Sequence, residues 1–498
     1  MQPATTDCIV STGAGRARGR SGQGVLRFLG IPYAAAPVGK LRFQAPRAAA
    51  RWAGIRDATT PGANAPQVIR AFPGLDVTPL VGQGWRPGDE YLTANIWTPD
   101  LAAKLPVLVF IHGGAFVGGS GDAAVHTGGE FARSGIVYVS INYRLGVEGF
   151  LPIPGAVSNL GLRDQIAALQ WVAENIHRFG GDPGKVTVAG ESAGAMTLCN
   201  LMTSPLAKGL IRRAIVQSGH GSMVRPLIVA ARLAARVAAT LRVSCDLQGF
   251  SQCSAQQCAS AVDAVSRPEV AMDLRDVQGR NSAYGLTRFL PVYGDEVLPE
   301  HPLQALRKGA GGDAQLLIGT NREEMNIYLV PTGVRQNIAA AAATAMLRAS
   351  EPAASDILAA YGMTHGDRRP GEALTQAMSD LVFRWPARQF AGAHRGPTHL
   401  YEFDWRSPAC DGQLGACHAL ELPFVFKTLP SCTGAAGIAG SAPPQELSDR
   451  IHQTWVGFIA QGRLDWPAFD ATERACMTLE NAKVVRDADM PVARWLDS

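Results

Sequence analysis

Apolar residues are concentrated in short continuous runs that recur along the middle of the chain. The runs Val107–Ile111 and Ile136–Asn142 contain few polar residues, which is typical of parallel strands covered on both faces. Further runs rich in β-branched and aromatic residues predict strands at Leu92–Trp97, Val186–Ala189, Ala214–Ser218, Gln315–Gly319 and His399–Phe403. Together these runs predict a mainly parallel, twisted central sheet.

Between the strands, apolar residues recur every three or four positions, which is the spacing of a helix with one buried face. Leu162, Ile166, Leu169, Ala173 and Ile176 predict a helix that ends before the turn residues 180–183. Similar patterns predict helices over about 227–241 and 448–460. Because strands and helices alternate, we predict an α/β fold with helices flanking the sheet.

The first part of the chain follows a different pattern. From Cys8 to about Phe43, short alternating segments separated by glycines predict an antiparallel hairpin at an edge of the sheet. Residues 48–86 predict a loop, because Gly, Pro and Asn recur there without periodicity. Arg42 is a candidate for an ion pair, buried or solvated, with Asp89 or Glu90 that ties this edge down.

The patterns contain no repeat, low-complexity tract or linker. We therefore predict a single α/β domain over residues 1–498, with helical insertions around 225–290 and 325–395. The 47% apolar content and 18% charged content are ordinary for a globular protein. A net charge of +4 on 498 residues is too small to indicate nucleic acid or a membrane surface as a partner.

The cellular compartment is predicted from the termini and the cysteines. The first eight residues lack the basic and apolar segments of a signal peptide, and no apolar stretch is long enough to span a membrane. The nine cysteines are odd in number and scattered, so we expect them to be reduced, in a cytoplasmic protein. Cys253 and Cys258 are spaced too widely for a CxxC metal site, and we expect no metal or organic cofactor.

The stretch Val186–Ala195 carries the most distinctive chemistry. It contains Gly190-Glu-Ser-Ala-Gly194, a G-x-S-x-G pattern between a predicted strand and a helix. Glycines at both ends allow strand and helix to approach closely, which exposes the Ser192 hydroxyl on a tight turn. The amide of Ala193 then lies at the start of a helix, where the helix dipole favours a developing oxyanion.

Acyl transfer by a serine also needs further amide donors, a histidine base and a carboxylate. Gly114 and Ala115 follow a buried strand, at the position from which α/β hydrolases supply oxyanion donors. The order serine, acid, histidine of these enzymes is satisfied by Glu323 or Glu324 after one late strand and by His418 after the next. By position alone, His418 is one candidate among ten histidines.

A set of short motifs extends from Gly30 to near Pro467, almost the whole chain. The segments are Gly30–Ala34, Asn95–Pro99, Asn142–Gly146, Asn159–Gly161, Asp164–Gln165, Phe179–Pro183, Gly190–Gly194, Gln217–Gly219 and His418–Phe426. Through these segments the chain resembles the type-B carboxylesterase/cholinesterase family of α/β-hydrolase serine esterases.

The resemblance implies a serine carboxylesterase for small-molecule esters, with the catalytic triad Ser192, Glu324 and His418. It also implies an oxyanion hole formed by the amides of Gly114, Ala115 and Ala193. Met325 stands where the family usually has glycine after its acid. Glu191 and Ser218 are expected to support the triad, with a purely packing role as the alternative.

A second departure concerns the disulfide of secreted relatives. The family's Glu-Asp-Cys-Leu signature is here Asp89-Glu90-Tyr91-Leu92, and the partner cysteine is replaced by Ala65. That disulfide cannot form, which supports the prediction of a reducing compartment.

Substrate preference is less defined. Small residues in 220–223 favour a modest acyl group, and the resemblance implies that the Gly-Gly-Ala segment leaves room for bulky, even tertiary, alcohols. One alternative is a hydrolase specialised for one natural or xenobiotic ester, lactone or amide. The other is a non-catalytic adhesion protein of the same fold.

Overall fold

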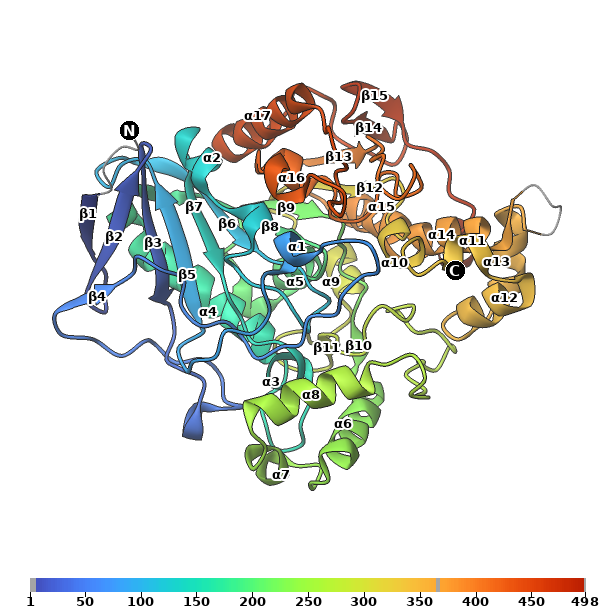
Figure 1. Ribbon diagram of the computed structural model, residues 1–498, viewed down its shortest axis with the longest axis horizontal. Coiled ribbons are helices and arrows are strands. Elements are labelled where there is room, and N and C mark those ends of the chain that lie inside the picture. Colours follow the sequence, from blue (N-terminus) through green and yellow to red (C-terminus); the bar gives the residue numbers. More distant parts are fainter. Residues whose placement is uncertain (1–5, 364–367, 497–498) are drawn as a thin grey trace.

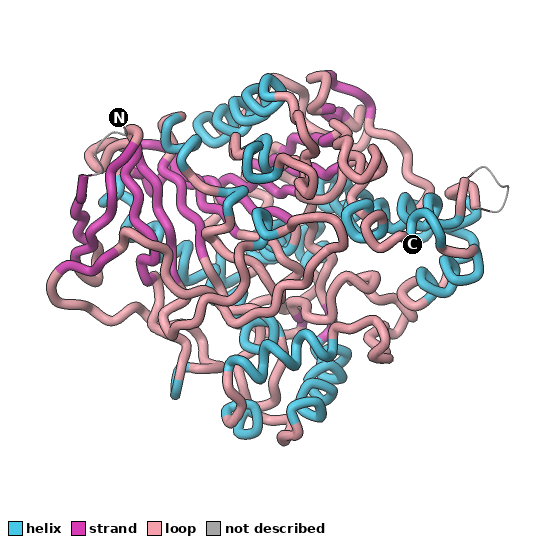
Figure 2. Tube along the Cα trace, viewed as in Figure 1, coloured by secondary structure: helices cyan, strands magenta, loops and turns pink. Residues whose placement is uncertain are grey.

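The computed structural model describes residues 6–363 and 368–496, which form a large sheet with helices around it (Figures 1 and 2). The strands are β1 (Thr6–Ser11), β2 (Arg16–Gly22), β3 (Val25–Pro32), β4 (Ile55–Asp57), β5 (Thr93–Thr98), β6 (Leu105–Ile111), β7 (Val137–Ile141), β8 (Gly181–Glu191), β9 (Arg213–Gln217), β10 (Arg225–Pro226), β11 (Val292–Tyr293), β12 (Gln315–Asn321), β13 (Thr398–Phe403), β14 (Ala475–Thr478) and β15 (Lys483–Arg486).

The large sheet has the order β1-β2-β3-β5-β7-β6-β8-β9-β12-β13-β14-β15, with β4 beside β2, and β10 and β11 form a separate pair. From β7 to β14 all neighbours are parallel. The pairs β1–β2, β2–β3, β3–β5 and β5–β7 are antiparallel. This confirms a mostly parallel sheet with an antiparallel N-terminal edge. The opposite edge also ends in an antiparallel strand, β15, which the sequence patterns did not predict.

The helices lie around this sheet (Figure 1). They are α1 (Thr78–Val81), α2 (Gly129–Arg133), α3 (Gly146–Phe150), α4 (Leu160–Asn175), α5 (Ala193–Thr203), α6 (Leu227–Leu241), α7 (Leu247–Ser251), α8 (Ala255–Val265), α9 (Pro302–Arg307), α10 (Asn326–Leu329), α11 (Val334–Asn337), α12 (Ala340–Arg348), α13 (Ala354–Ala360), α14 (Pro370–Ser379), α15 (Trp385–Ala393), α16 (Leu422–Val425), α17 (Gln445–Gln461) and α18 (Ala493–Leu496). A π-helical turn, Asp380–Arg384, joins α14 to α15, and short 3₁₀ turns occur at residues 39–41, 124–126, 176–179, 205–207 and 429–432.

Two hydrophobic cores form, one on each face of the sheet. Along β6, Val107 and Val109 pack with the core that includes α4 and α5. Leu108 and Phe110, which alternate with them, pack with the core that includes α2 and α17. Because successive strand residues point to opposite faces, an uninterrupted apolar run is what a strand covered on both sides requires.

The predicted ion pair of Arg42 with Asp89 or Glu90 is wrong. Arg42 instead pairs with the buried carboxylate of Glu148 at 2.8 Å, and Glu90 pairs with Arg56 at 2.5 Å. Glu148 lies on α3, where Tyr91 Oη also donates to it at 2.6 Å. The guanidinium is therefore directed towards a carboxylate that lies far from it in sequence, so neighbouring sequence positions did not indicate the partner.

All nine cysteines are free in the part of the chain that the structure describes. Within residues 6–363 and 368–496, no group of three His, Cys, Asp or Glu side chains is arranged to hold a metal ion. Cys258 Sγ accepts a hydrogen bond from Arg42 Nη2 at 3.3 Å, which gives this thiol a structural contact. Across the same described ranges, no helix is both long enough and apolar enough to cross a bilayer.

Candidate active site

Ser192 lies on the turn between β8 and α5, in a strained backbone conformation. Its φ is +54° and its ψ is −126°, a combination of backbone angles that residues other than glycine rarely adopt. A Cβ at Gly190 would lie 2.5 Å from the carbonyl carbon of Gly194, and one at Gly194 would overlap the Ile111 carbonyl oxygen. Glycine is therefore required at both ends of the turn, and strand, serine and helix are forced into close approach.

The loop after β6 lies against this turn. Gly114 and Ala115 both have positive φ, +115° and +55°. Their amides, and the amide of Ala193 at the first position of α5, have no hydrogen-bond acceptor among the described residues. Three donors at the end of one strand and the start of one helix are thus available to an external oxygen.

Glu324 follows β12, and its carboxylate contacts His418, which lies in the loop after β13. Glu324 Oε2 is 2.7 Å from His418 Nδ1. Glu324 Oε1 accepts from Ser218 Oγ at 2.7 Å and from the Asn321 amide at 2.8 Å. Glu324 is fully buried, so these donors replace the water that its carboxylate would otherwise bind.

The adjacent carboxylate points elsewhere. Glu323 forms an ion pair with Arg406 and accepts a hydrogen bond from the Ala416 amide at 2.8 Å. Of the two carboxylates that the sequence offered, Glu324 is the one that contacts the imidazole. Met325 has φ −79° and ψ −4°, and its side chain is buried, so a side chain in place of the family's glycine is accommodated here.

The other imidazole nitrogen of His418 faces the residue beside the serine. His418 Nε2 is 3.1 Å from Glu191 Oε1. In the described chain, no hydrogen bond joins Ser192 Oγ to His418. Catalytic hydrogen bonds are often long or poorly aligned without substrate and tighten when it binds. The structure thus brings Ser192, Glu191, Glu324 and His418 into one region and places Glu191 against Nε2.

Burial and the neighbouring carboxylates have opposite effects on this histidine. Burial lowers the pKa of His418, but the charges of Glu191 and Glu324 outweigh it and raise the pKa to about 9. Burial raises the pKa of Glu191 to about 8, with His418 acting in the opposite direction. The Glu191–His418 pair therefore holds a proton more tightly near neutral pH than the two groups would in water.

We expect Glu191→Gln to shift the acidic limb of the pH dependence of kcat/KM to lower pH, by roughly one unit. If His418 is the general base, it must be unprotonated to act, so activity falls as pH drops through its pKa. Removing the Glu191 charge lowers the pKa of His418, so the imidazole stays unprotonated at lower pH. Initial rates of ester hydrolysis from pH 5 to pH 10 measure the shift. An acidic limb that stays in place would contradict the coupling of these two groups.

Several residues around Ser192, Glu324 and His418 were not singled out from the sequence. The Phe383 ring lies 4.6 Å from the His418 ring, and the Tyr328 ring lies 5.9 Å from it. Glu421 is fully buried and accepts from Asn321 Nδ2 at 2.7 Å. Glu421 lies three residues after His418, a spacing that could have drawn attention to it. Phe383 belongs to the π-helical turn, for which the sequence gave no signal.

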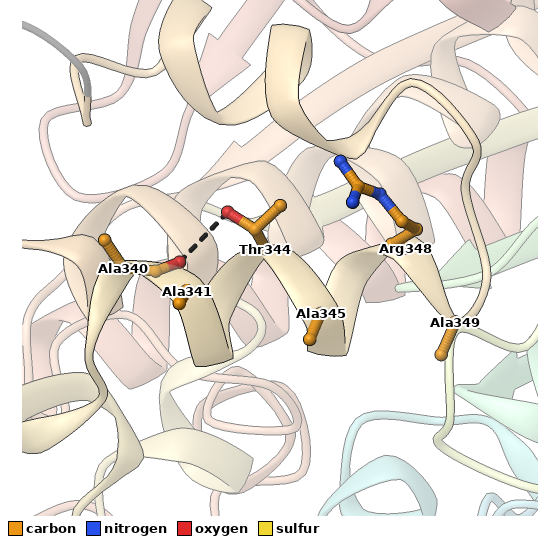
Figure 3. Close-up of a pocket in the computed structure, with 6 residues that line it drawn as sticks. All are labelled: Ala340, Ala341, Thr344, Ala345, Arg348 and Ala349. Carbon is orange, nitrogen blue, oxygen red and sulfur yellow. Dashed lines mark hydrogen bonds between the residues drawn. The ribbon is translucent and has the colours of Figure 1, made fainter.

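A surface hollow along α12 is lined by a different set of residues (Figure 3). It is lined by Ala340, Ala341, Thr344, Ala345, Arg348 and Ala349. The Thr344 hydroxyl donates to the Ala340 carbonyl oxygen at 3.0 Å, so no free nucleophile faces this hollow. Ser192, Glu324 and the loop residues Gly114 and Ala115 lie instead at the carboxyl ends of strands of the large sheet, the usual place for ligands in open α/β sheets.

A parallel sheet with a serine on a sharp strand-to-helix turn, followed in sequence by an acid and a histidine, defines an α/β hydrolase. The profile of the carboxylesterase family matches residues 6–491, and the chain belongs to that family. It is a carboxylic ester hydrolase.

Individual relatives are similar over nearly their whole length. The chain is 36% identical to the para-nitrobenzyl esterase of Bacillus subtilis (strain 168), over 96% of this chain and 95% of that protein. It is 34% identical to the phenmedipham hydrolase of Pseudarthrobacter oxydans, over 97% of each. A solved structure of a PNB esterase superimposes with a TM-score of 0.81 at 32% identity, covering 98% of this chain and 99% of the other.

Proposed function

We propose that the protein is a serine carboxylesterase that works through an acyl-enzyme on Ser192. His418 is the general base and acid, Glu324 orients it, and the amides of Gly114, Ala115 and Ala193 form the oxyanion hole. One observation carries this proposal: the Glu324 carboxylate accepts hydrogen bonds from both Ser218 Oγ and His418 Nδ1. This group of side chains lies next to Ser192, whose backbone is strained.

In the first step, Ser192 Oγ attacks the ester carbonyl while His418 Nε2 accepts the serine proton. The carbonyl oxygen becomes an oxyanion, which the three amides stabilise. His418 then gives the proton to the departing alkoxide, so the alcohol leaves and an ester bond joins the acyl group to Ser192. Glu324 stabilises the imidazolium by accepting from Nδ1 throughout.

In the second step, water takes the place of the alcohol. His418 accepts a proton from the water as its oxygen attacks the acyl carbon, and the same amides hold the second oxyanion. The proton then returns to Ser192 Oγ as the acid leaves. Glu191 assists through its charge, with Oε1 3.1 Å from Nε2 of His418, and Ser218 assists by fixing one oxygen of Glu324.

The names of the relatives support esters with a bulky alcohol as first substrates. One relative is a para-nitrobenzyl esterase, so we propose para-nitrobenzyl esters, with a series of p-nitrophenyl esters of rising acyl length to define the acyl pocket. Esters of tertiary alcohols test the room beside the Gly-Gly-Ala segment. The phenmedipham hydrolase relative supports including phenmedipham in the screen.

A fluorophosphonate probe tests the nucleophile directly. We expect one equivalent of probe per chain, attached to Ser192 and located by peptide mass spectrometry, because the probe reacts with activated serines. A para-nitrobenzyl ester added first should slow the labelling, and heat-denatured protein should remain unlabelled. Labelling at another serine would overturn the assignment of Ser192, and no labelling would favour a non-catalytic protein of this fold.

A further inference from the structure

Consecutive carbonyl groups in the loop after β6 are each held by a specific donor. The Gly113 oxygen is 2.7 Å from His112 Nδ1. The Gly114 oxygen accepts from the Val117 and Gly118 amides at 3.1 Å and 2.9 Å. In a planar trans peptide the carbonyl and the next amide point in opposite directions. These contacts therefore aim the Gly114 and Ala115 amides away from the loop, which leaves them free for an oxyanion.

The next carbonyl is held from a distant part of the chain. The Ala115 oxygen accepts a hydrogen bond from Thr287 Oγ1 at 2.9 Å. Thr287 is buried and lies 172 residues away in sequence, in the segment between α8 and β11. Among the described residues, only Thr287 donates a hydrogen bond to the Ala115 oxygen. The peptide after Ala115 therefore depends on this one side chain for its orientation.

That peptide joins two residues with positive φ. Ala115 and Phe116 have φ of +55° and +65°, a region that residues with side chains adopt only at a cost in free energy. Rotating the peptide between them would change the φ of Phe116 and relieve its strain, and the Thr287 hydrogen bond opposes this rotation.

Thr287 itself is on a firmly held segment. Arg225 is 2% exposed, and its guanidinium donates to the Arg288 oxygen at 2.6 Å and to Asn281 Oδ1 at 3.1 Å. Ser282 Oγ donates to the Val224 oxygen at 2.9 Å. In the described chain Arg225 has no carboxylate partner. Its guanidinium instead donates hydrogen bonds to the segment that contains Thr287.

We propose that Thr287 is a positioning residue for the oxyanion hole. Its hydroxyl holds the peptide that follows Ala115 and so fixes the Ala115 Cα from its C-terminal side, while the contacts to the Gly113 and Gly114 oxygens fix the preceding peptides. Together these contacts keep the Gly114 and Ala115 amides directed at the transition state. This inference rests on the proposed function. Beyond that function, we infer that the segment before β11 controls how well the loop after β6 stabilises an oxyanion, although the two segments are far apart in sequence.

The test uses Thr287→Val, which keeps the shape of the side chain and removes the hydroxyl, and Thr287→Ser, which restores the hydroxyl. We expect Thr287→Val to lower kcat about tenfold with KM within about twofold. Removing an oxyanion-hole donor altogether lowers kcat about a hundredfold or more, and a donor that is only misdirected should cause a smaller loss. Its affinity for a trifluoromethyl ketone, which forms an oxyanion on the serine, should fall in parallel. Thr287→Ser should recover most of both.

The matched control is Thr478→Val, which removes another buried threonine hydroxyl that donates to a carbonyl oxygen, in β14. It should leave kcat unchanged, and the melting temperature of each variant shows any general destabilisation. Wild-type kcat and ketone affinity in Thr287→Val would overturn the proposal, as would equal losses in Thr478→Val. If Ser192→Ala stays active, the proposed function itself fails, whatever the threonine variants show.

Discussion

Replacing Ser192 with alanine is expected to lower kcat for ester hydrolysis by at least about a thousandfold. Without Oγ no acyl-enzyme can form, and the imidazole has no serine proton to accept. The remaining amides can still polarise a bound ester, so a residual rate above that of water is expected. Steady-state rates with a p-nitrophenyl ester, normalised to folded protein, measure the loss.

Ser204→Ala is the matched control for this change. Ser204 is another buried serine, at the far end of α5, where its oxygen accepts a hydrogen bond from the Leu206 amide at 3.3 Å. Its loss should leave kcat close to that of the unaltered enzyme. Retention of most of the activity in Ser192→Ala, in protein shown to be free of unaltered enzyme, would mean that another group attacks the ester.

The core strands could be predicted because each carries its information locally. Val107–Ile111 and Ala214–Val216 are continuous apolar runs, and both lie in the parallel part of the sheet. β14 and β15 have four residues each, and β15 is exposed throughout, so neither carries an apolar pattern strong enough to predict it. The antiparallel β14–β15 edge therefore became visible only in the structure.

The candidate site also has features that the local sequence predicts and contacts that it does not predict. The turn around Ser192 could be recognised because the close approach of strand and helix demands glycines at fixed positions. The choice of Glu324 over Glu323 came from the resemblance to the family. Contacts such as Phe383 with His418 and Thr287 with Ala115 join segments that are far apart in sequence, and nothing in the local pattern marks them.

Glu324→Gln is expected to lower kcat by about a thousandfold to ten-thousandfold, although it changes only one atom of the side chain. The two oxygens of Glu324 face three donors, which are His418 Nδ1, Ser218 Oγ and the Asn321 amide. A glutamine offers one oxygen and an amide group that donates. The oxygen can satisfy the Ser218 and Asn321 side, which then leaves the glutamine amide facing Nδ1.

The consequence is the wrong tautomer of the imidazole. If Nδ1 must accept a hydrogen bond from glutamine, the ring carries its proton on Nε2, the atom that has to receive the serine proton. The negative charge that stabilises the imidazolium is lost as well. Both effects act on the transition state, so kcat should fall much more than KM changes.

Glu323→Gln separates this effect from a general loss of negative charge in the loop. Glu323 is the neighbouring residue, but its carboxylate pairs with Arg406 and the Ala416 amide. Its replacement should keep kcat within about threefold, since a partly exposed ion pair contributes at most about 1 kcal/mol. If the two variants lose activity equally, the loop as a whole, and not the contact between Glu324 and Nδ1, supports the histidine.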